Sequence, residues 1–478
     1  MRKFKKIFQT IFVMTFVLIC GVMFAGCGDK LTITSIDKTS TSGYVDTYTI
    51  TYSNGDTSTF TVTNGKNGVD GQDGTSVSIT EIYEKYVEEY GDISYQDFLK
   101  QYLSLNTNGN ASVINECLLS TLKLYTEFYE TTQTQSMFGY STTKATAVYT
   151  GSGVIYKMYS DYTYVITNYH VVYSSKANAD NGSYIAHSIH GYLYGSESNP
   201  TKDSTKTNGY NTYSYGDYAI DFEYVGGSIA NDIAIIRTKT DNITKINSNA
   251  KQVTLADKYY VGETAIAIGN PEDEGISVTE GIVSVDNEYI SLSIDGTSRN
   301  YRSIRIDTAL YSGNSGGGLF NSNGQLIGIT NAGDSEDQNV NYAIPLNIVT
   351  GIADNIMHYY QGSKTSAYNI TLGITVNSQN SKYVYNEKSG YGEIVEDIVI
   401  SSVTSSSIAS KMGLSSGDIL ETFTINSKTY TLARNFDIFD LLLTVREGDV
   451  ISFTFTRDGT QNSSSNYTVV SADLNAID

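Results

Sequence analysis

Residues 311–319 read Tyr311-Ser312-Gly313-Asn314-Ser315-Gly316-Gly317-Gly318-Leu319, which places a serine among glycines between two apolar segments. Glycine tolerates backbone conformations that other residues avoid, so this turn lets the N–H groups of Gly313 and Ser315 converge and leaves the Ser315 hydroxyl exposed. Converging N–H groups stabilise an oxygen that becomes negatively charged during a reaction. Standing alone, the same residues would be interpreted as an ordinary glycine–serine turn, so the rest of the chain must supply partners for the serine.

The base that such a serine needs is sought among four histidines. His170 lies near the end of the apolar run 164–172, where a buried strand would deliver its side chain to a loop. His187 and His190 lie in a polar stretch, and His358 lies in a predicted helix beside two tyrosines. These three are interpreted as surface or packing residues, which leaves His170 as the predicted base.

The acid that would orient this imidazole is predicted to be Asp232, which directly precedes the apolar run 233–236. A carboxylate at the start of a buried strand is suited to accept the Nδ1 proton of a histidine. Asp217 and Asp221 are competing acids, but neither directly precedes a continuous apolar run. The order histidine, aspartate, serine is that of chymotrypsin-fold enzymes rather than of subtilisins or α/β-hydrolases.

Seven segments, taken in order, resemble the successive motifs of the HtrA family of trypsin-fold serine proteases. They are Gly151-Ser152-Gly153-Val154-Ile155, Thr167-Asn168-Tyr169-His170-Val171-Val172, Asn231-Asp232-Ile233-Ala234-Ile235-Ile236, Ala267-Ile268-Gly269-Asn270-Pro271, Thr279-Glu280-Gly281-Ile282-Val283-Ser284, Gly313-Asn314-Ser315-Gly316-Gly317 and Asn341-Tyr342-Ala343-Ile344-Pro345. The resemblance covers roughly residues 143–475. It implies a mainly β fold, with a chymotrypsin-like double β-barrel protease domain followed by a PDZ-like α+β domain.

The resemblance also assigns roles to residues of the site. It implies that His170 is the general base, Asp232 its orienting acid and Ser315 the nucleophile. The oxyanion hole is expected to be formed by Gly313, Asn314 and Ser315. No metal or organic cofactor is expected to take part.

The C-terminal part continues the resemblance. Leu372-Gly373-Ile374 resembles the carboxylate-binding loop of an HtrA PDZ domain, and residues 407–420 resemble its following helix and turn. Backbone N–H groups around Gly373 would hold a peptide C-terminus while the peptide adds as a strand to the edge of the sheet. A generic small β domain is the alternative interpretation.

Some positions depart from the family pattern. Gly318 stands where the family usually has proline, and Tyr169 where it has asparagine or alanine. Neither position supplies a proton-transfer atom, so activity is expected, although Gly318 would loosen the strand after the nucleophile. The family's trimer-forming N-terminal segment is not recognisable, which leaves open whether the protein forms a homotrimer.

Substrate preference is predicted from the expected S1 pocket, assigned to Ala309 and Thr330. Ala309 lies six residues before Ser315, where trypsin-like enzymes place the acid that selects lysine or arginine. We therefore expect cleavage after small or medium aliphatic residues rather than after basic ones.

The N-terminus has the pattern of an export signal. Four basic residues among the first six precede an apolar run at 7–24. The following Phe24-Ala25-Gly26-Cys27 resembles the lipobox of bacterial lipoproteins, which implies removal of residues 1–26 and lipidation of Cys27. An uncleaved membrane anchor is the alternative. Either way, the remainder is expected outside the cytoplasm, tethered to the bacterial cell membrane.

Composition agrees with an acidic, β-rich protein. The formal charge of the 478 residues is −20, and loss of the four basic residues of the signal makes it −24, which argues against nucleic acid as a partner. The chain has 42 glycines, 40 tyrosines and no tryptophan, a composition typical of strands and turns. Its three cysteines do not suffice for a disulfide framework, and Cys117 is interpreted as a buried structural thiol.

The predicted organisation follows from changes in pattern along the chain. The expected parts are a signal peptide at 1–26, a small β module at 27–64, a glycine-rich spacer at 65–78, a helical stalk at 79–135, a protease domain at 136–362 and a PDZ-like domain at 366–475. Residues 173–216 are polar and repetitive and are predicted mainly as an inserted surface loop.

Two hypotheses about function remain. The first is a lipid-anchored extracytoplasmic serine endopeptidase that hydrolyses unfolded or exported polypeptides and binds peptide C-termini through its PDZ-like domain. The second is a catalytically silent scaffold or chaperone that uses the PDZ-like and N-terminal modules for binding. The complete set of His170, Asp232 and Ser315 favours the enzyme, because a silent relative is free to lose these residues.

Overall fold

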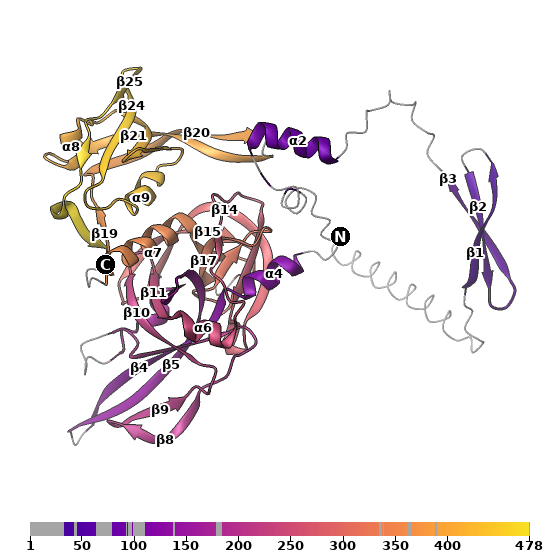
Figure 1. The fold of residues 1–478 in the computed structure, drawn as a ribbon, viewed down its shortest axis with the longest axis horizontal. Coiled ribbons are helices and arrows are strands. Elements are labelled where there is room, and N and C mark those ends of the chain that lie inside the picture. Colours follow the sequence, from indigo (N-terminus) through magenta and orange to yellow (C-terminus); the bar gives the residue numbers. More distant parts are fainter. Residues whose placement is uncertain are drawn as a thin grey trace, which may run out of the picture. The chain divides into compact units, whose positions relative to one another are not determined.

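A computed structural model of the chain describes residues 33–42, 45–63, 79–91, 93, 98, 110–136, 139–177, 184–333, 337, 339–360, 365–387 and 390–477. The chain divides into two compact units, residues 1–105 and 106–478 (Figure 1). The predicted signal at 1–26, Cys27 and the spacer at 65–78 lie outside the described residues. Within the described part, no helix is both long and apolar enough to cross a membrane.

The first unit contains a small antiparallel sheet, whose strands are β1 (Ile33–Ser42), β2 (Val45–Tyr52) and β3 (Thr57–Thr63). The predicted hairpin is present as β2 and β3, and its turn is closed by a hydrogen bond from Asp56 N to Asn54 Oδ1 of 3.0 Å. Helix α2 (Ile79–Tyr90) lies where helical spacing predicted one. Its Tyr83 ring packs on Phe98 with centroids 5.3 Å apart.

The second unit begins with a closed barrel in the order β10-β11-β6-β5-β4-β7. Its strands are β4 (Thr121–Ser136), β5 (Gly139–Met158), β6 (Tyr162–Thr167), β7 (Ser188–Leu193), β10 (Ile220–Ser228) and β11 (Ile233–Lys239). The accompanying elements are α4 (Ala111–Leu118), α5 (Tyr169–Val172), the hairpin of β8 (Thr201–Thr207) and β9 (Tyr210–Ser214), and α6 (Thr240–Ile246). Strand β11 is apolar at four consecutive positions because both of its faces are covered.

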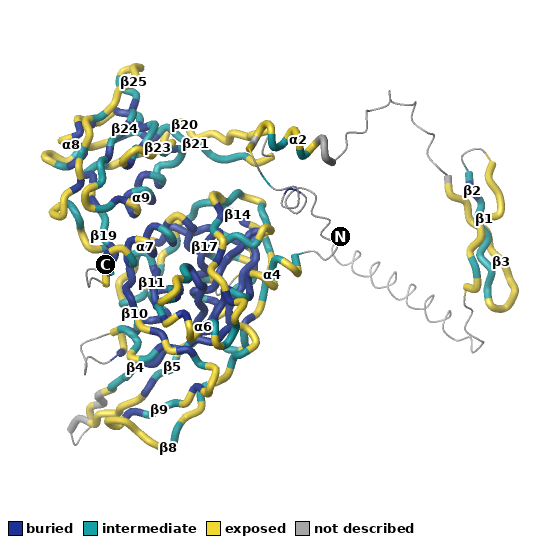
Figure 2. The backbone as a smooth tube through the Cα atoms, viewed as in Figure 1, coloured by how far each residue is buried: buried dark blue, intermediate teal, exposed yellow. Residues whose placement is uncertain are grey.

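A second barrel follows. Its sheet runs β12-β17-β16-β13-β14-β15-β18, and β18 also pairs with β17, so the last six strands close into a ring. The strands are β12 (Thr254–Leu255), β13 (Thr264–Gly269), β14 (Ser277–Ser293), β15 (Ser298–Ile306), β16 (Gly318–Phe320), β17 (Gln325–Gly333) and β18 (Asn341–Pro345). The 3₁₀ turn η2 (Pro271–Asp273) and helix α7 (Leu346–Tyr360) complete this part. The predicted mainly β fold with two barrels is confirmed, and buried residues gather in both barrels (Figure 2).

Two sequence predictions about this unit are wrong. The segment 121–136 was expected to continue a helical stalk, but it forms β4 inside the first barrel, so the barrel part begins before residue 136. Its residues 121–128 are all buried, so both faces of the strand are covered and the alternation typical of a strand is lost. The polar stretch 173–216, expected mainly as a surface loop, contains β7, which pairs with both β4 and β10.

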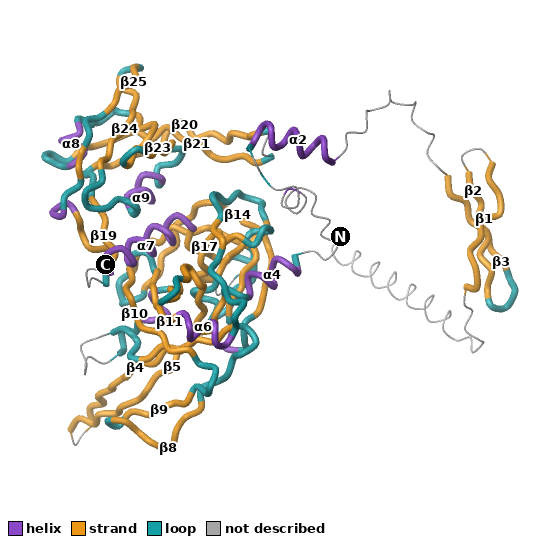
Figure 3. Tube along the Cα trace, in the orientation of Figure 1, coloured by secondary structure: helices purple, strands orange, loops and turns teal. Residues whose placement is uncertain are grey.

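The C-terminal part has a core of its own. Its main sheet runs β20-β21-β22-β24-β25, with the short strands β23 and β26 attached, and β19 pairs with β27. The bounds are β19 (Ala367–Ile370), β20 (Ile374–Asn386), β21 (Tyr391–Val403), β22 (Ile419–Ile425), β23 (Lys428–Thr431), β24 (Val450–Arg457), β25 (Thr460–Ser463), β26 (Tyr467–Thr468) and β27 (Leu474–Ile477). Helix α8 (Ile408–Met412) lies within the segment 407–420, where a helix was predicted, and α9 (Asp437–Leu442) follows β23 (Figure 3). The 3₁₀ turn η3 (Ser471–Asp473) precedes β27.

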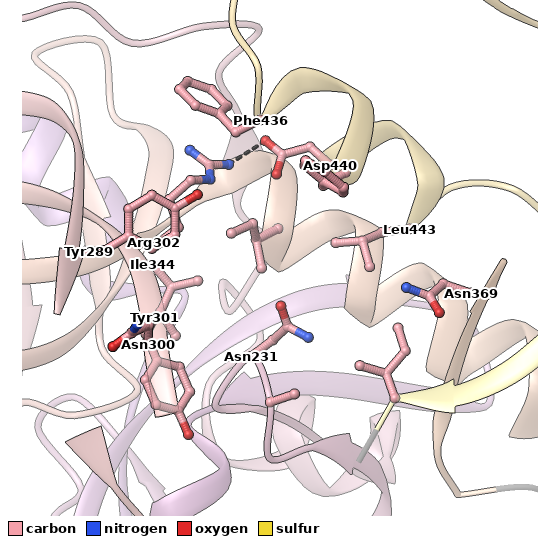
Figure 4. A pocket seen from close by; sticks show the side chains of 14 residues that line it. Asn231, Tyr289, Asn300, Tyr301, Arg302, Ile344, Asn369, Phe436, Asp440 and Leu443 are labelled. Atoms are coloured by element: carbon pink, nitrogen blue, oxygen red, sulfur yellow. Dashed lines mark hydrogen bonds and ion pairs between the residues drawn. The ribbon is translucent and has the colours of Figure 1, made fainter. Parts of the chain in front are cut away.

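Helix α9 faces the second barrel through a buried ion pair. Arg302 of β15 pairs with Asp440 (Figure 4). Asp440 also accepts a 3.0 Å hydrogen bond from Asn347 Nδ2. Burial raises the pKa of Asp440 to about 6, although the charge of Arg302 acts in the opposite direction. A cavity of about 250 Å³ beside the pair is also lined by Asn231 and Tyr301. Asn231, which directly precedes Asp232, therefore lines the same cavity as residues of the C-terminal part.

Candidate active site

His170 and Asp232 form a close pair on the first barrel. The Nδ1 atom of His170 lies 2.8 Å from Oδ2 of Asp232, and the backbone N–H of His170 donates to Oδ1 over 2.9 Å. Asp232 is fully buried, with a left-handed φ of 53°, and its own carbonyl accepts a 3.0 Å hydrogen bond from Asn168 Nδ2. The His170 side chain is one-third exposed. One ring nitrogen is therefore held by the carboxylate while the ring reaches the surface.

The environment of His170 affects its titration in two opposite ways. Burial lowers the pKa of the imidazole, because it penalises the charged form. The negative charge and hydrogen bond of Asp232 outweigh this effect and hold the pKa of His170 above its ordinary value of 6.5. An imidazole with a raised pKa is a stronger base, which suits it to accept a proton from a hydroxyl.

Ser315 comes from the second barrel and faces the same cleft as His170. The cleft has a volume of about 510 Å³, and both residues line it. The Ser315 hydroxyl donates to the carbonyl of Asn331 over 3.1 Å. The Ser315 carbonyl accepts a 2.8 Å hydrogen bond from Ser152 N of the first barrel. The first barrel therefore supplies the pair of His170 and Asp232 to this site, and the second barrel supplies Ser315.

The turn before Ser315 has its backbone fixed. Gly313 has a φ of 97°, and a Cβ there would lie 2.2 Å from the carbonyl oxygen of Asn270. The Ser312 carbonyl accepts a 2.6 Å hydrogen bond from Glu272 N. Because N–H and C=O point in opposite directions across a trans peptide, the Gly313 N–H faces away from Glu272.

The expectation for Asn314 in the oxyanion hole needs a correction. The Asn314 N–H donates to the Tyr311 carbonyl over 3.0 Å, which closes the turn. This donor is therefore used inside the protein, and Gly313 and Ser315 remain as the N–H groups that suit an oxyanion.

Neither of the residues assigned to the S1 pocket, Ala309 and Thr330, lines the cleft. Thr330 is buried, and its hydroxyl donates to the carbonyls of Asn314 and Gly317 over 2.7 and 3.1 Å. Ala309 is half-buried, and its carbonyl accepts from Thr279 Oγ1. The cleft is lined instead by the neighbouring Asn331 and Ala332. Thr330 therefore supports the Ser315 turn from below.

Sequence reasoning missed other residues of the cleft. Leu292, Ser293 and Ile294, at the tip of the β14–β15 hairpin, line it on one side, and Tyr173 lines it on another. No local motif marks these residues, because only the folding of the hairpin brings them near Ser315. Of these residues, Leu292 and Ile294 supply apolar surface to the cleft.

Gly318 and Tyr169, the two residues that depart from the family pattern, both lie near the cleft or the Ser315 turn. Gly318 begins β16, where it is buried and pairs with Ile268 and Ile329, so the strand after the nucleophile keeps its pairing on both sides. The ring of Tyr169 stacks on Tyr173 with centroids 5.3 Å apart, at the border of the cleft.

The predicted carboxylate-binding loop lies between β19 and β20. Leu372 is buried, and its carbonyl accepts from Ala409 N over 3.0 Å. Gly373 has a φ of 76°, and its carbonyl accepts from Thr404 N over 2.8 Å. The N–H groups of Gly373 and Ile374 therefore face away from these partners. Strand β20 is an edge strand of the described sheet.

The remaining candidates lie apart from His170. Asp221 lies 2.8 Å from His190, and His187 stacks on Tyr129 with centroids 3.7 Å apart. Cys117 is buried, and desolvation raises the pKa of its thiol to about 12, so it is protonated at neutral pH. Its interpretation as a structural thiol agrees with this position.

Comparisons with known proteins agree with the geometry. A family model described as a trypsin-like peptidase domain matches residues 151–329. The serine protease Do-like HtrA of Bacillus subtilis (strain 168) is 30% identical over 293 residues, 60% of this chain and 57% of that protein. The periplasmic serine endoprotease DegP of Escherichia coli (strain K12) is 31% identical over 275 residues, 56% of this chain and 47% of that protein. A solved structure of "HtrA-type protease AlgW with tripeptide" is 22% identical with a TM-score of 0.45, covering 77% of this chain and 97% of that chain.

The segment that matches the trypsin-like peptidase domain, residues 151–329, includes His170, Asp232 and Ser315. A further relative, the serine protease Do-like HtrA of Lactococcus lactis subsp. lactis (strain IL1403), is 28% identical over 65% of this chain. The chain is therefore similar to HtrA-type serine proteases, and this similarity supports a serine-type endopeptidase. It spans 68% of the Lactococcus relative, and 57% and 47% of the other two.

Proposed function

We propose that the protein hydrolyses peptide bonds of unfolded or exported polypeptides with Ser315 as nucleophile, His170 as general base and Asp232 as orienting acid. The observation that carries this proposal is the 2.8 Å contact between His170 Nδ1 and the buried Asp232 carboxylate, in the cleft that Ser315 also lines.

The reaction follows from the positions of these groups. As the Ser315 oxygen attacks a substrate carbonyl, His170 Nε2 accepts the hydroxyl proton and later donates it to the leaving amine. Asp232 stabilises the imidazolium that forms in between. The N–H groups of Gly313 and Ser315 stabilise the oxyanion of the tetrahedral intermediate. Water then hydrolyses the acyl-enzyme by the same route, which regenerates Ser315.

The test is covalent labelling by a fluorophosphonate, which reacts with activated serines. We expect labelling of the wild-type protein, located at Ser315 by mass spectrometry, and none in Ser315→Ala. Ser293→Ala is the matched control, because this serine lines the same cleft and is expected to leave labelling unchanged. An unlabelled wild-type protein in the presence of unfolded substrate would favour the catalytically silent scaffold.

The pH dependence of activity is a second expected result. Only neutral His170 accepts a proton, so activity falls as pH decreases through the pKa of His170, which Asp232 holds above 6.5. Below that pKa, kcat/KM is expected to fall about tenfold per pH unit. The measurement is hydrolysis of fluorescent casein from pH 8 to 5, with circular dichroism at each pH to show that the fold persists. Constant activity over this range would contradict the role of His170.

We also propose that the C-terminal part is a PDZ-like domain that binds peptide C-termini at Leu372, Gly373 and Ile374. Support comes from the outward N–H groups of the loop and the edge position of β20, to which a peptide adds as a strand. The parts proposed are a β module at 27–64, a protease domain that now begins near residue 110, and a PDZ-like domain at 366–475.

The proposed location is extracytoplasmic, with a lipid anchor at Cys27. Support comes from the basic and apolar pattern of residues 1–24 and from Gly26-Cys27 after it. Among the relatives, DegP is named as periplasmic. Metabolic labelling with an alkynyl fatty acid is expected to modify the wild-type protein and not Cys27→Ser.

A further inference from the structure

A strained turn lies directly behind the oxyanion turn. Glu272 and Asp273, in η2, have φ values of 52° and 65°, which are left-handed conformations that residues other than glycine rarely adopt. Two such residues in succession persist only where the surroundings hold them in place. Strain of this kind is concentrated at functional sites, so the contacts that maintain it are informative.

Asp273 is held by a buried cation. Lys123 of β4 is 2% exposed at its side chain, and its Nζ lies 2.8 Å from Asp273 Oδ1 and donates to the Asp273 carbonyl over 3.1 Å. Tyr125 OH donates to the same carboxylate over 2.6 Å, and Asn199 Oδ1 accepts from both Lys123 and Tyr125. Burial raises the pKa of Asp273, but the hydrogen bonds from Lys123, Tyr125 and Asn270 outweigh this effect and leave it below its ordinary value. The carboxylate is therefore ionised at neutral pH.

The same turn holds both carbonyls that flank the Gly313 N–H. Glu272 N donates to the Ser312 carbonyl over 2.6 Å. Asn270 N donates to Ser152 Oγ over 2.9 Å, and Ser152 Oγ donates to the Gly313 carbonyl over 2.8 Å. Because the carbonyls of Ser312 and Gly313 are both held by hydrogen bonds, the Gly313 N–H is fixed in orientation and points away from the strained turn.

We propose that the Lys123–Asp273 ion pair is a positioning device for the oxyanion hole: it maintains the left-handed turn whose Glu272 N–H holds the Ser312 carbonyl and thereby directs the Gly313 N–H toward the cleft. Neither residue touches the substrate. This inference rests on the proposed function, because the Gly313 N–H stabilises an oxyanion only if the protein catalyses acyl transfer.

The test compares two substitutions that both remove the carboxylate but differ in backbone preference. In Asp273→Ala, alanine disfavours a φ of 65° and lacks the anchor, so the turn is expected to relax and release the Ser312 carbonyl. Loss of one oxyanion donor lowers kcat by about 10² to 10³, with KM little changed. In Asp273→Gly, glycine adopts the same φ without strain, so kcat is expected to stay within about tenfold of wild type. Glu274→Gln, an exposed change in the same turn, is the control and is expected to leave kcat unchanged.

The measurements are kcat and KM on fluorescent casein, the rate of fluorophosphonate labelling, and the thermal midpoint of each variant. A purely structural role would lower the thermal midpoint of the alanine and glycine variants alike and would not separate their kcat values. Equal kcat for Asp273→Ala and wild type, or equal losses in both Asp273 variants, would overturn the inference. Failure of the wild-type protein to be labelled would instead contradict the proposed function.

Discussion

Replacing His170 by alanine is expected to lower kcat for an unfolded protein substrate by about 10⁶, because removal of the base leaves the Ser315 hydroxyl protonated. The remaining rate would come from substrate binding and the N–H groups of Gly313 and Ser315. The measurement is the rate of fluorescent casein hydrolysis, followed for long enough to detect residual activity.

The control for this variant is His358→Ala, which removes a histidine from α7, outside the cleft lining. It is expected to retain wild-type kcat. Ser315→Ala combined with His170→Ala is expected to be no slower than either single variant, since the two residues act as one unit. A His170→Ala protein within tenfold of wild type would show that another group accepts the proton.

Replacing Asp232 by asparagine is expected to lower kcat by about 10⁴. The amide of asparagine has the shape of the carboxylate, but its NH₂ group faces His170 Nδ1 and favours the tautomer with the proton on Nε2, where a base is needed. The variant also loses the charge that raises the pKa of His170, so its remaining activity should persist to lower pH.

Asp221→Asn is the matched control for this prediction, because Asp221 also contacts a histidine, His190, but outside the cleft. It is expected to leave kcat and its pH dependence unchanged. If Asp221→Asn and Asp232→Asn were equally active, the assignment of Asp232 would be wrong. Both variants are compared with wild type by pH-resolved hydrolysis of fluorescent casein.

The sequence predicted the two barrels, and it supplied the candidates His170, Asp232 and Ser315, because both depend on local patterns. Apolar runs mark β6, which ends three residues before His170, and β11, which begins directly after Asp232. Helix α7 contains His358, as predicted, since its apolar positions follow helical spacing after Pro345. These hydrophobic patterns can be recognised in the sequence because each strand or helix has its own periodicity.

Other parts could not be predicted, for reasons of packing between distant segments. Lys123 is a charged residue buried in β4, and its contacts with Asp273, 150 positions away, and with Asn199 explain why it lies inside. Strand β7 is short and lies within a polar stretch, so its place in the barrel depends on pairing with β4 and β10.

Two sequence predictions about the site were wrong, and the hydrogen bonds of the structure correct them. Asn314 was expected to donate to an oxyanion, yet its N–H closes the turn on Tyr311. Thr330 was expected to line a pocket, yet its hydroxyl bonds to the turn that contains Asn314. Asn314 and Thr330 could each either face a substrate or support the turn. The hydrogen bond that each one donates within the protein shows that it supports the turn.

The hydrogen bond from Ser152 N to the Ser315 carbonyl joins the two barrels at the point where their residues must meet. Since His170 and Asp232 belong to one barrel and Ser315 to the other, neither barrel is an enzyme by itself. A shift of one barrel against the other by about 1 Å is expected to slow hydrolysis about 10²-fold while both hydrophobic cores stay intact. Proteolytic activity therefore reports the relative position of the two barrels more sensitively than a measurement of their unfolding does.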